Sequence, residues 1–177
     1  NNLIVLGPLL YAIHHFEEHE VFNFIEWKLK YFNHSAAALS TEAILSILVC
    51  VIVVFVFLHL VKNNKASAYI ILYILFAIQI INAVFHIFFS LYFNDFSPGL
   101  ITSILVYLPG NYLIVRAAFQ EGYLKSYAEY GLIALLGTAT FVLFEIYGPL
   151  VIVLSIISSL LYFVWFNKRL ADKGELS

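Results

Sequence analysis

The chain has 177 residues, of which 63% are hydrophobic and 11% are charged, and its formal net charge is −2. A soluble domain carries roughly 25% charged residues, so this composition excludes an ordinary water-soluble protein and predicts one all-α transmembrane helical bundle over residues 1–177. The small net charge and the scattered Lys and Arg residues exclude nucleic acid as a partner and leave the lipid bilayer as the expected surroundings.

Apolar runs predict five to six transmembrane helices, because about 20 residues are needed to cross a hydrocarbon core of roughly 30 Å. The first run is short, whereas the next three have spanning length. Gly148 and Pro149 separate the last two runs and favour a tight hairpin, since this pair breaks a helix. The predicted spans comprise residues 1–16, 43–61, 66–94, 96–115, 130–144 and 146–167.

Basic residues predict the orientation of these spans. Alternating spans place seven of the nine Lys and Arg on one side, namely Lys62, Lys65, Arg116, Lys125, Lys168, Arg169 and Lys173. The positive-inside rule makes that side cytoplasmic, so we expect a multi-pass protein of the cell membrane with both termini in the cytoplasm. Lys28 and Lys30 fall on the predicted outside. Their segment, residues 17–32, either continues the first helix or lies along the membrane interface.

A cluster of ionisable residues ends the first apolar run: His14, His15, Phe16, Glu17, Glu18, His19 and Glu20. At about 100° per residue, His14, Glu17 and Glu18 share one helix face. An imidazole and two carboxylates that project together from successive turns are the ligands used by metal sites in helical bundles. The alternative is a charged segment at the membrane surface that binds nothing.

A polar stripe in the third predicted span is the second feature, formed by Gln79, Asn82, His86 and Ser90 within an arc of about 80°. Polar side chains are costly in hydrocarbon, so this stripe faces other helices or a cavity. His86 lies about 12 Å of helical rise from the outer end of its span, which puts it at a depth similar to that of His14. Hydrogen bonding between helices would explain the same stripe without a ligand.

The sequence also resembles the HXXEE family of small bacterial membrane proteins. The family is marked by an HXXEE motif, matched by residues 14–18, by one further histidine, matched by His86, and by a Tyr-x-Pro-Gly motif. Residues 107–110 fit the last motif by letter, whereas residues 96–99 have Phe in place of Tyr but stand at a helix start. The resemblance covers residues 10–115 and implies no particular reaction.

We expect a divalent transition metal, zinc or iron, in the outer half of the bundle, with the ligands His14, Glu17, Glu18 and His86. Glu17 is alternatively a catalytic general base. Asn82 and Tyr107 are expected beside the ligands, and Glu145 is a further carboxylate that could join them. The expected substrate is a lipid-like apolar molecule. The same residues would also suit a metal or proton transporter, or a metal-free acid-base enzyme.

Overall fold

The computed structural model describes residues 3–32 and 41–172, and within them every regular element is helical. Three elements are π-helical segments: η2, η3 and η4. In chain order the elements are η1 Leu3–Leu6, α1 Gly7–Phe16, η2 Glu17–Val21, α2 Phe24–Tyr31, α3 Thr41–Lys62, α4 Lys65–Leu75, η3 Phe76–Ile80, α5 Ile81–Phe93, α6 Leu100–Thr102, η4 Ser103–Tyr107, α7 Leu108–Gln120, α8 Tyr127–Tyr147 and α9 Leu150–Asp172. The predicted all-α bundle is therefore confirmed.

Four of the described helices are long and apolar enough to cross a membrane, which indicates a membrane protein. These helices are Lys65–Phe93, Leu100–Gln120, Tyr127–Tyr147 and Leu150–Arg169. A fifth apolar helix, Ser46–Lys62, is shorter over its described side chains. Spanning by residues 1–16 and 43–61 remains a prediction. The predicted hairpin at Gly148 is confirmed, because α8 ends there at a positive φ and α9 begins two residues later.

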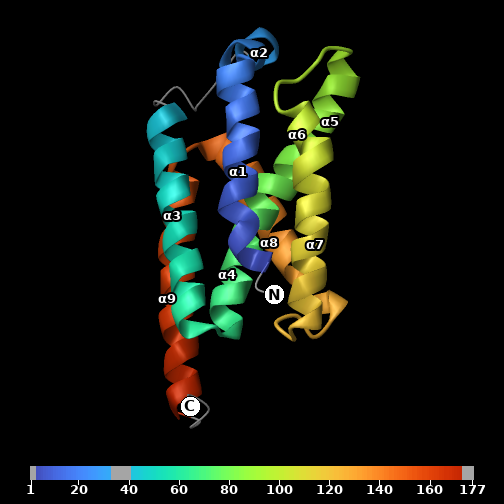
Figure 1. Cartoon of the computed structure of the whole chain (residues 1–177). Helices are drawn as coiled ribbons and strands as arrows, with labels where there is room; N and C mark the ends of the chain where they lie inside the picture. Colours follow the sequence, from blue (N-terminus) through green and yellow to red (C-terminus); the bar gives the residue numbers. More distant parts are fainter. Residues whose placement is uncertain (1–2, 33–40, 173–177) are drawn as a thin grey trace.

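The first helix is longer than its apolar run, because η1, α1 and η2 follow one another without a break from Leu3 to Val21. The chain turns at Asn23, whose side-chain oxygen accepts a hydrogen bond of 3.1 Å from the backbone N–H of Glu26 and so starts α2. Residues 17–21 therefore continue the first helix, whereas α2 is a separate short helix beside its end (Figure 1).

Figure 1 shows α1 in front of α4 and α5, with α3 and α9 along one side of the bundle and α7 along the other. The connections from α3 to α4 and from α7 to α8 lie at the lower end of this view, as does the end of α9. The turn from α5 to α6 and the short helix α2 lie at the upper end. The end of α1 that carries the ionisable cluster therefore lies opposite the end that carries most basic residues.

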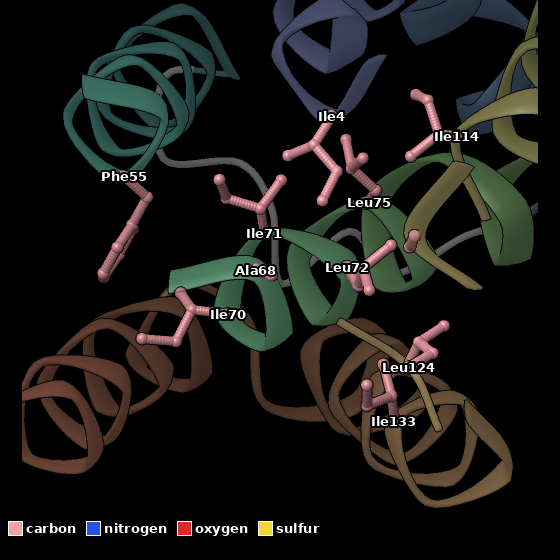
Figure 2. Packing of buried hydrophobic residues seen from close by; sticks show 11 residues of the cluster. Ile4, Phe55, Ala68, Ile70, Ile71, Leu72, Leu75, Ile114, Leu124 and Ile133 are labelled. Carbon is pink, nitrogen blue, oxygen red and sulfur yellow. The ribbon is translucent and has the colours of Figure 1, made fainter. Parts of the chain in front are cut away.

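The apolar core fills the lower half of the bundle, where side chains from η1, α4 and α7 point toward one another (Figure 2). Ile4, Leu75 and Ile114 are among its buried members. Gly7 allows α1 to approach α4 closely, because a Cβ there would lie 2.5 Å from a methyl carbon of Leu75. Small residues at such crossings are how membrane helices gain packing contacts in a solvent as apolar as their own side chains.

A buried hydrogen-bond network separates this core from the upper half. The side chain of Gln79 donates to the backbone carbonyl of Gly7 over 2.8 Å and accepts from the amide of Asn111 over 2.8 Å. The network joins α1, η3 and α7 and gives these polar groups the hydrogen-bond partners that lipid cannot provide. Gln79, the first residue of the polar stripe, therefore holds helices together.

The helix α2 is fixed to the rest of the upper end by ion pairs and aromatic contacts. Lys30 and the hydroxyl of Tyr31 bind the carboxylate of Asp95 at 2.8 Å and 2.6 Å, and this hydrogen bonding, chiefly from Lys30, lowers the pKa of Asp95. The ring of Tyr31 stacks on Phe93 with centroids 4.0 Å apart. Aromatic residues of this kind gather where a membrane meets water.

Candidate metal centre

His14, Glu18 and His86 come together from α1, η2 and α5, and all three are buried. Oε1 of Glu18 lies 3.4 Å from Nε2 of His14 and 3.0 Å from Nε2 of His86. Ligands about 2.0–2.1 Å from one metal, at angles of about 90–110°, lie roughly 3.0–3.4 Å from one another. Both distances from Glu18 therefore fit a shared metal ion, and the ligand atoms of all three residues lie within 4.8 Å of one another.

The outer nitrogens of both rings bind hydroxyl groups. Nδ1 of His14 lies 2.7 Å from the hydroxyl of Thr102, and Nδ1 of His86 lies 2.9 Å from the hydroxyl of Ser97. Thr102 itself donates to the carbonyl of Gly99, so it accepts from Nδ1–H of His14 and leaves the lone pair on Nε2. Metal-binding histidines are typically held this way, with the far N–H donated to a fixed acceptor.

Asn82 lies beside the same ring, because its side-chain nitrogen is 2.9 Å from Nε2 of His14. Tyr107 stacks on the other side of His14, with ring centroids 4.2 Å apart and planes at 28°. Both residues expected beside the ligands therefore contact His14. Neither contact involves the hydroxyl of Tyr107, which is buried without a hydrogen-bond partner among the described residues.

Glu17 is placed differently from Glu18, although both lie in η2 and both are buried. Its two carboxylate oxygens accept hydrogen bonds from the backbone N–H groups of Ile101 and Thr102 at 3.1 Å and 2.6 Å. A carboxylate at the first backbone N–H groups of a helix compensates donors that have no partner within the helix. The structure therefore does not bring Glu17 into the group formed by His14, Glu18 and His86.

Glu145 also lies outside the group. Its carboxylate forms an ion pair with Lys28 at 3.1 Å, between α8 and α2. His59 lies apart from the group and binds the hydroxyl of Ser67 at 2.8 Å in the lower half of the bundle. His34 lies outside the described residues.

Gly99 packs directly against the three clustered side chains. A Cβ at this position would lie 2.8 Å from Cε1 of His14, 3.0 Å from Cγ of Glu18 and 3.0 Å from Cε1 of His86. The backbone φ of Gly99 is +96°, a conformation that other residues rarely adopt. A Cβ on Gly110, in contrast, would meet Leu10. Of the two Pro-Gly pairs, the one at residues 98–99 therefore shapes the centre.

The helix around the centre is irregular in two places. Glu17 and Glu18 lie in the π-helical segment η2, and Ser103 and Tyr107 lie in η4. The latter ends at Tyr107, two residues before Pro109, which has no N–H to continue an α-helical ladder and stands in the first turn of α7. Single π turns inside α-helices are frequent at functional sites.

A cavity of about 620 Å³ opens beside the centre. Tyr11, His14, Glu18, His19 and Asn82 form its polar wall. The rest is largely apolar, with side chains from α3, α5, α8 and α9 that include Phe55, Phe85, Phe141, Ile152 and Ile156. The hydroxyl of Tyr11 is buried and lacks a hydrogen-bond partner among the described residues. One buried donor of the polar wall is therefore unsatisfied among the described residues.

Sequence reasoning missed three contributors to the centre. Ser97 and Thr102 orient the two rings, and a signal was present, because one hydroxyl residue directly precedes the Pro-Gly pair at residues 98–99 and the other follows it by three residues. The other contributor is His19, whose Nε2 lies 3.9 Å from Oε2 of Glu18. Its spacing of four residues from His15 places both rings on one helix face.

The fold and the centre define a helical membrane protein with a buried His/Glu cluster beside a large cavity. A family model described as a protein of unknown function with an HXXEE motif matches residues 5–114, and the chain belongs to this family, as the motifs predicted. The match contains all three clustered residues and ends before α8. No curated protein and no solved structure matches the chain.

Proposed function

We propose that this protein is a membrane-embedded, metal-dependent enzyme that acts on a lipid-like apolar molecule. A divalent transition metal, zinc or iron, binds His14, Glu18 and His86, and the substrate occupies the adjacent cavity. The observation that carries the proposal is the position of Glu18. Its carboxylate contacts both buried imidazoles and also lines a cavity whose other walls are largely apolar.

Charge balance supports a metal at this position. A buried carboxylate is costly unless a positive charge compensates it. Lys28 and Lys30 are already paired with Glu145 and Asp95, and the nearest groups to Glu18 are histidines, which are cations only when protonated. A divalent cation would satisfy Glu18 and the lone pairs of both rings together.

The surrounding residues have roles that follow from their contacts. A metal with an open position supplies Lewis acidity or a bound water that ionises near neutral pH. Ser97 and Thr102 hold the two rings in orientation, and Tyr107 limits the movement of His14 by stacking on it. Tyr11 lines the cavity, and a polar group of the substrate that reaches its buried hydroxyl would accept a hydrogen bond from it.

The apolar walls of the cavity favour a lipid as the substrate. Its volume of about 620 Å³ is within the range of ligand pockets, roughly 300–1,000 Å³. Apolar side chains on α3, α8 and α9 complete it, and these helices expose other apolar side chains on the outside of the bundle. An apolar molecule could therefore enter from the bilayer without first crossing water.

We also propose that the lower end of the bundle in Figure 1 is cytoplasmic, since the connections that carry most Lys and Arg lie there. The metal centre then lies toward the outer face of the cell membrane. Cysteine introduced near Asp95 should react with an impermeant reagent from outside, whereas cysteine near Lys65 should not. The reverse labelling pattern would overturn this orientation.

Metal content tests the proposal first. Full-length protein purified in detergent without chelators should hold at least one equivalent of zinc or iron, or take it up on loading. His86→Ala and Glu18→Gln should lower the bound metal several-fold. Glu20→Gln removes an exposed carboxylate two residues from Glu18 and should change nothing, which makes it the matched control. Wild-type protein that cannot be loaded with Zn²⁺ or Fe²⁺ would refute the metal centre.

Lipid turnover tests the second part of the proposal, that the protein acts on a lipid. Metal-loaded protein in lipid nanodiscs is incubated with a membrane lipid extract, and the lipids are compared by mass spectrometry with those from Glu18→Gln protein. A product formed by the wild type alone supports an enzyme. Identical lipid profiles, with metal bound only to the wild type, would favour a metal-binding or transport protein instead.

One contact favours a metal-free enzyme as the second candidate. Nε2 of His86 lies 3.0 Å from Oε1 of Glu18, which is within the range for proton transfer between a general acid and a base. Turnover that persists after complete removal of metal would select this candidate over the first.

A further inference from the structure

We propose that Glu18 bridges two metal ions, and that His15 and His19 bind the second one. This inference rests on the proposed metal centre and extends it to a dinuclear site. The two carboxylate oxygens of Glu18 approach different histidines. Oε1 lies near His14 and His86, whereas Oε2 lies 3.9 Å from Nε2 of His19.

The second group has its own ligand geometry. One ring nitrogen of His15, one of His19 and one oxygen of Glu18 lie within 4.8 Å of one another. The two rings are 4.3 Å apart between centroids and come from successive turns of the same helix. Histidines four residues apart on a helix are a recurrent pair of zinc ligands.

An unsatisfied atom points to a ligand at this place. Nδ1 of His15 is buried and has no hydrogen-bond partner among the described residues. Burial of a polar atom without a partner costs roughly 1–3 kcal/mol, so native structures rarely leave one unmatched. The other face of His15 is covered by Tyr11, whose ring stacks on it with centroids 6.0 Å apart.

The two ions would differ in binding affinity and in their exposure to the cavity. The first pair of histidines is fully buried and held by hydroxyl groups, whereas His15 and His19 are half-buried. Glu18 is the one carboxylate in both groups, so the second ion has no carboxylate of its own to offset its positive charge. We therefore expect it to bind more weakly. His19 lines the cavity, so this ion would face the substrate.

A carboxylate shared by two metal ions would give the enzyme two positive charges at the cavity wall. Two-metal sites, with ions about 3.5–4 Å apart, hold the attacking and leaving oxygens of a displacement together. A substrate with an ester, phosphate or carboxylate oxygen at one end and an apolar chain at the other would fit both the ions and the cavity.

Zinc titration separates the two sites. The full chain in detergent, without an affinity tag, is loaded with Zn²⁺, desalted and analysed for metal and protein. The wild type and Glu20→Gln should saturate at two equivalents, the second bound more weakly. His15→Ala and His19→Gln should saturate at one, with helix content and thermal unfolding unchanged. Glu18→Gln should lose both.

Electron paramagnetic resonance gives a readout that a merely structural role would not change. Two Mn²⁺ ions bridged by Glu18 should show exchange coupling in the wild type, and His19→Gln should show only an uncoupled ion. Saturation of the wild type at one equivalent that is retained in His15→Ala and His19→Gln would overturn the second site and leave the first intact. A complete failure to load metal would refute the proposed function itself.

Discussion

The helix that contributes His86 and the helix that ends the chain differ in how far the protein covers them. In the most apolar stretch of Lys65–Phe93, 44% of the residues are buried within the protein, whereas in Leu150–Arg169 only 6% are. The intermediate helix Tyr127–Tyr147 has 11%. In Leu100–Gln120 the share is 28%. The segment Lys65–Gln120, with residues 3–32 packed against it, is therefore a packed unit, and α8 and α9 form a loosely covered layer against it.

The two parts also have different roles in the proposed function. Every ligand of the candidate centre lies in α1, η2 or α5, and the orienting hydroxyls lie at 97 and 102. The last two helices supply apolar walls of the cavity through residues such as Phe141 and Ile156. Metal binding is thus expected to depend on the packed unit, and enclosure of the substrate on α8 and α9.

The largest effect is expected at Gly99. Gly99→Ala would force a methyl group against His14, Glu18 and His86 and would also place a non-glycine residue at φ +96°. The conformation alone costs roughly 1–2 kcal/mol, and the contacts with the cluster add to it. We expect the loss of nearly all bound zinc together with a lower thermal unfolding temperature.

Gly131→Ala is the matched control in the loosely covered layer. Nothing lies within 4 Å of a Cβ built at Gly131, which is inside α8. Alanine should leave zinc binding intact and stabilise the helix by roughly 0.5–1 kcal/mol. Equal zinc content in both variants, measured by elemental analysis, would show that Gly99 does not shape the centre.

A smaller effect is expected at Ser97, whose hydroxyl binds Nδ1 of His86, the ring nitrogen that does not contact Glu18. Ser97→Ala leaves Nδ1 of His86 without its partner at 2.9 Å and frees the ring to rotate. Loss of such an orienting partner typically weakens metal binding about 10–100-fold. Competition for zinc with a chelator of known affinity measures the change. An unchanged affinity would mean that burial alone positions the ring.

Much of this arrangement could be predicted from local sequence. Composition and run length predicted the helical bundle, and the spacing of His14 and Glu18 by one turn placed them on one face. His86 was predicted to face other helices because a polar side chain in an apolar helix is costly where it meets lipid. These predictions rest on composition, run length and residue spacing, which are properties of the local sequence.

The different positions of Glu17 and Glu145 could not be predicted in this way. Glu17 shares a helix face with His14, yet it binds the start of α6, a segment more than 80 residues away. Glu145 lies at the expected end of the bundle but pairs with Lys28 on α2. Both outcomes depend on which distant segments meet. The π-helical turns were likewise not predicted, because a fixed angle of 100° per residue assumes a regular helix.

The smallest effect is expected at the ion pair that joins the two parts of the bundle. Lys28 on α2 and Glu145 on α8 lie 3.1 Å apart, and both side chains are partly exposed. Exposed ion pairs contribute about 0–1 kcal/mol, because water and salt screen them. Lys28→Gln should therefore lower the thermal unfolding temperature only slightly, with less effect in high salt.

Lys30→Gln is the control, since its partner Asp95 lies within the packed unit. Zinc content should be unchanged in both variants. A loss of zinc in Lys28→Gln alone would show that α8 helps to hold η2 in place, and that the metal centre depends on both parts of the bundle.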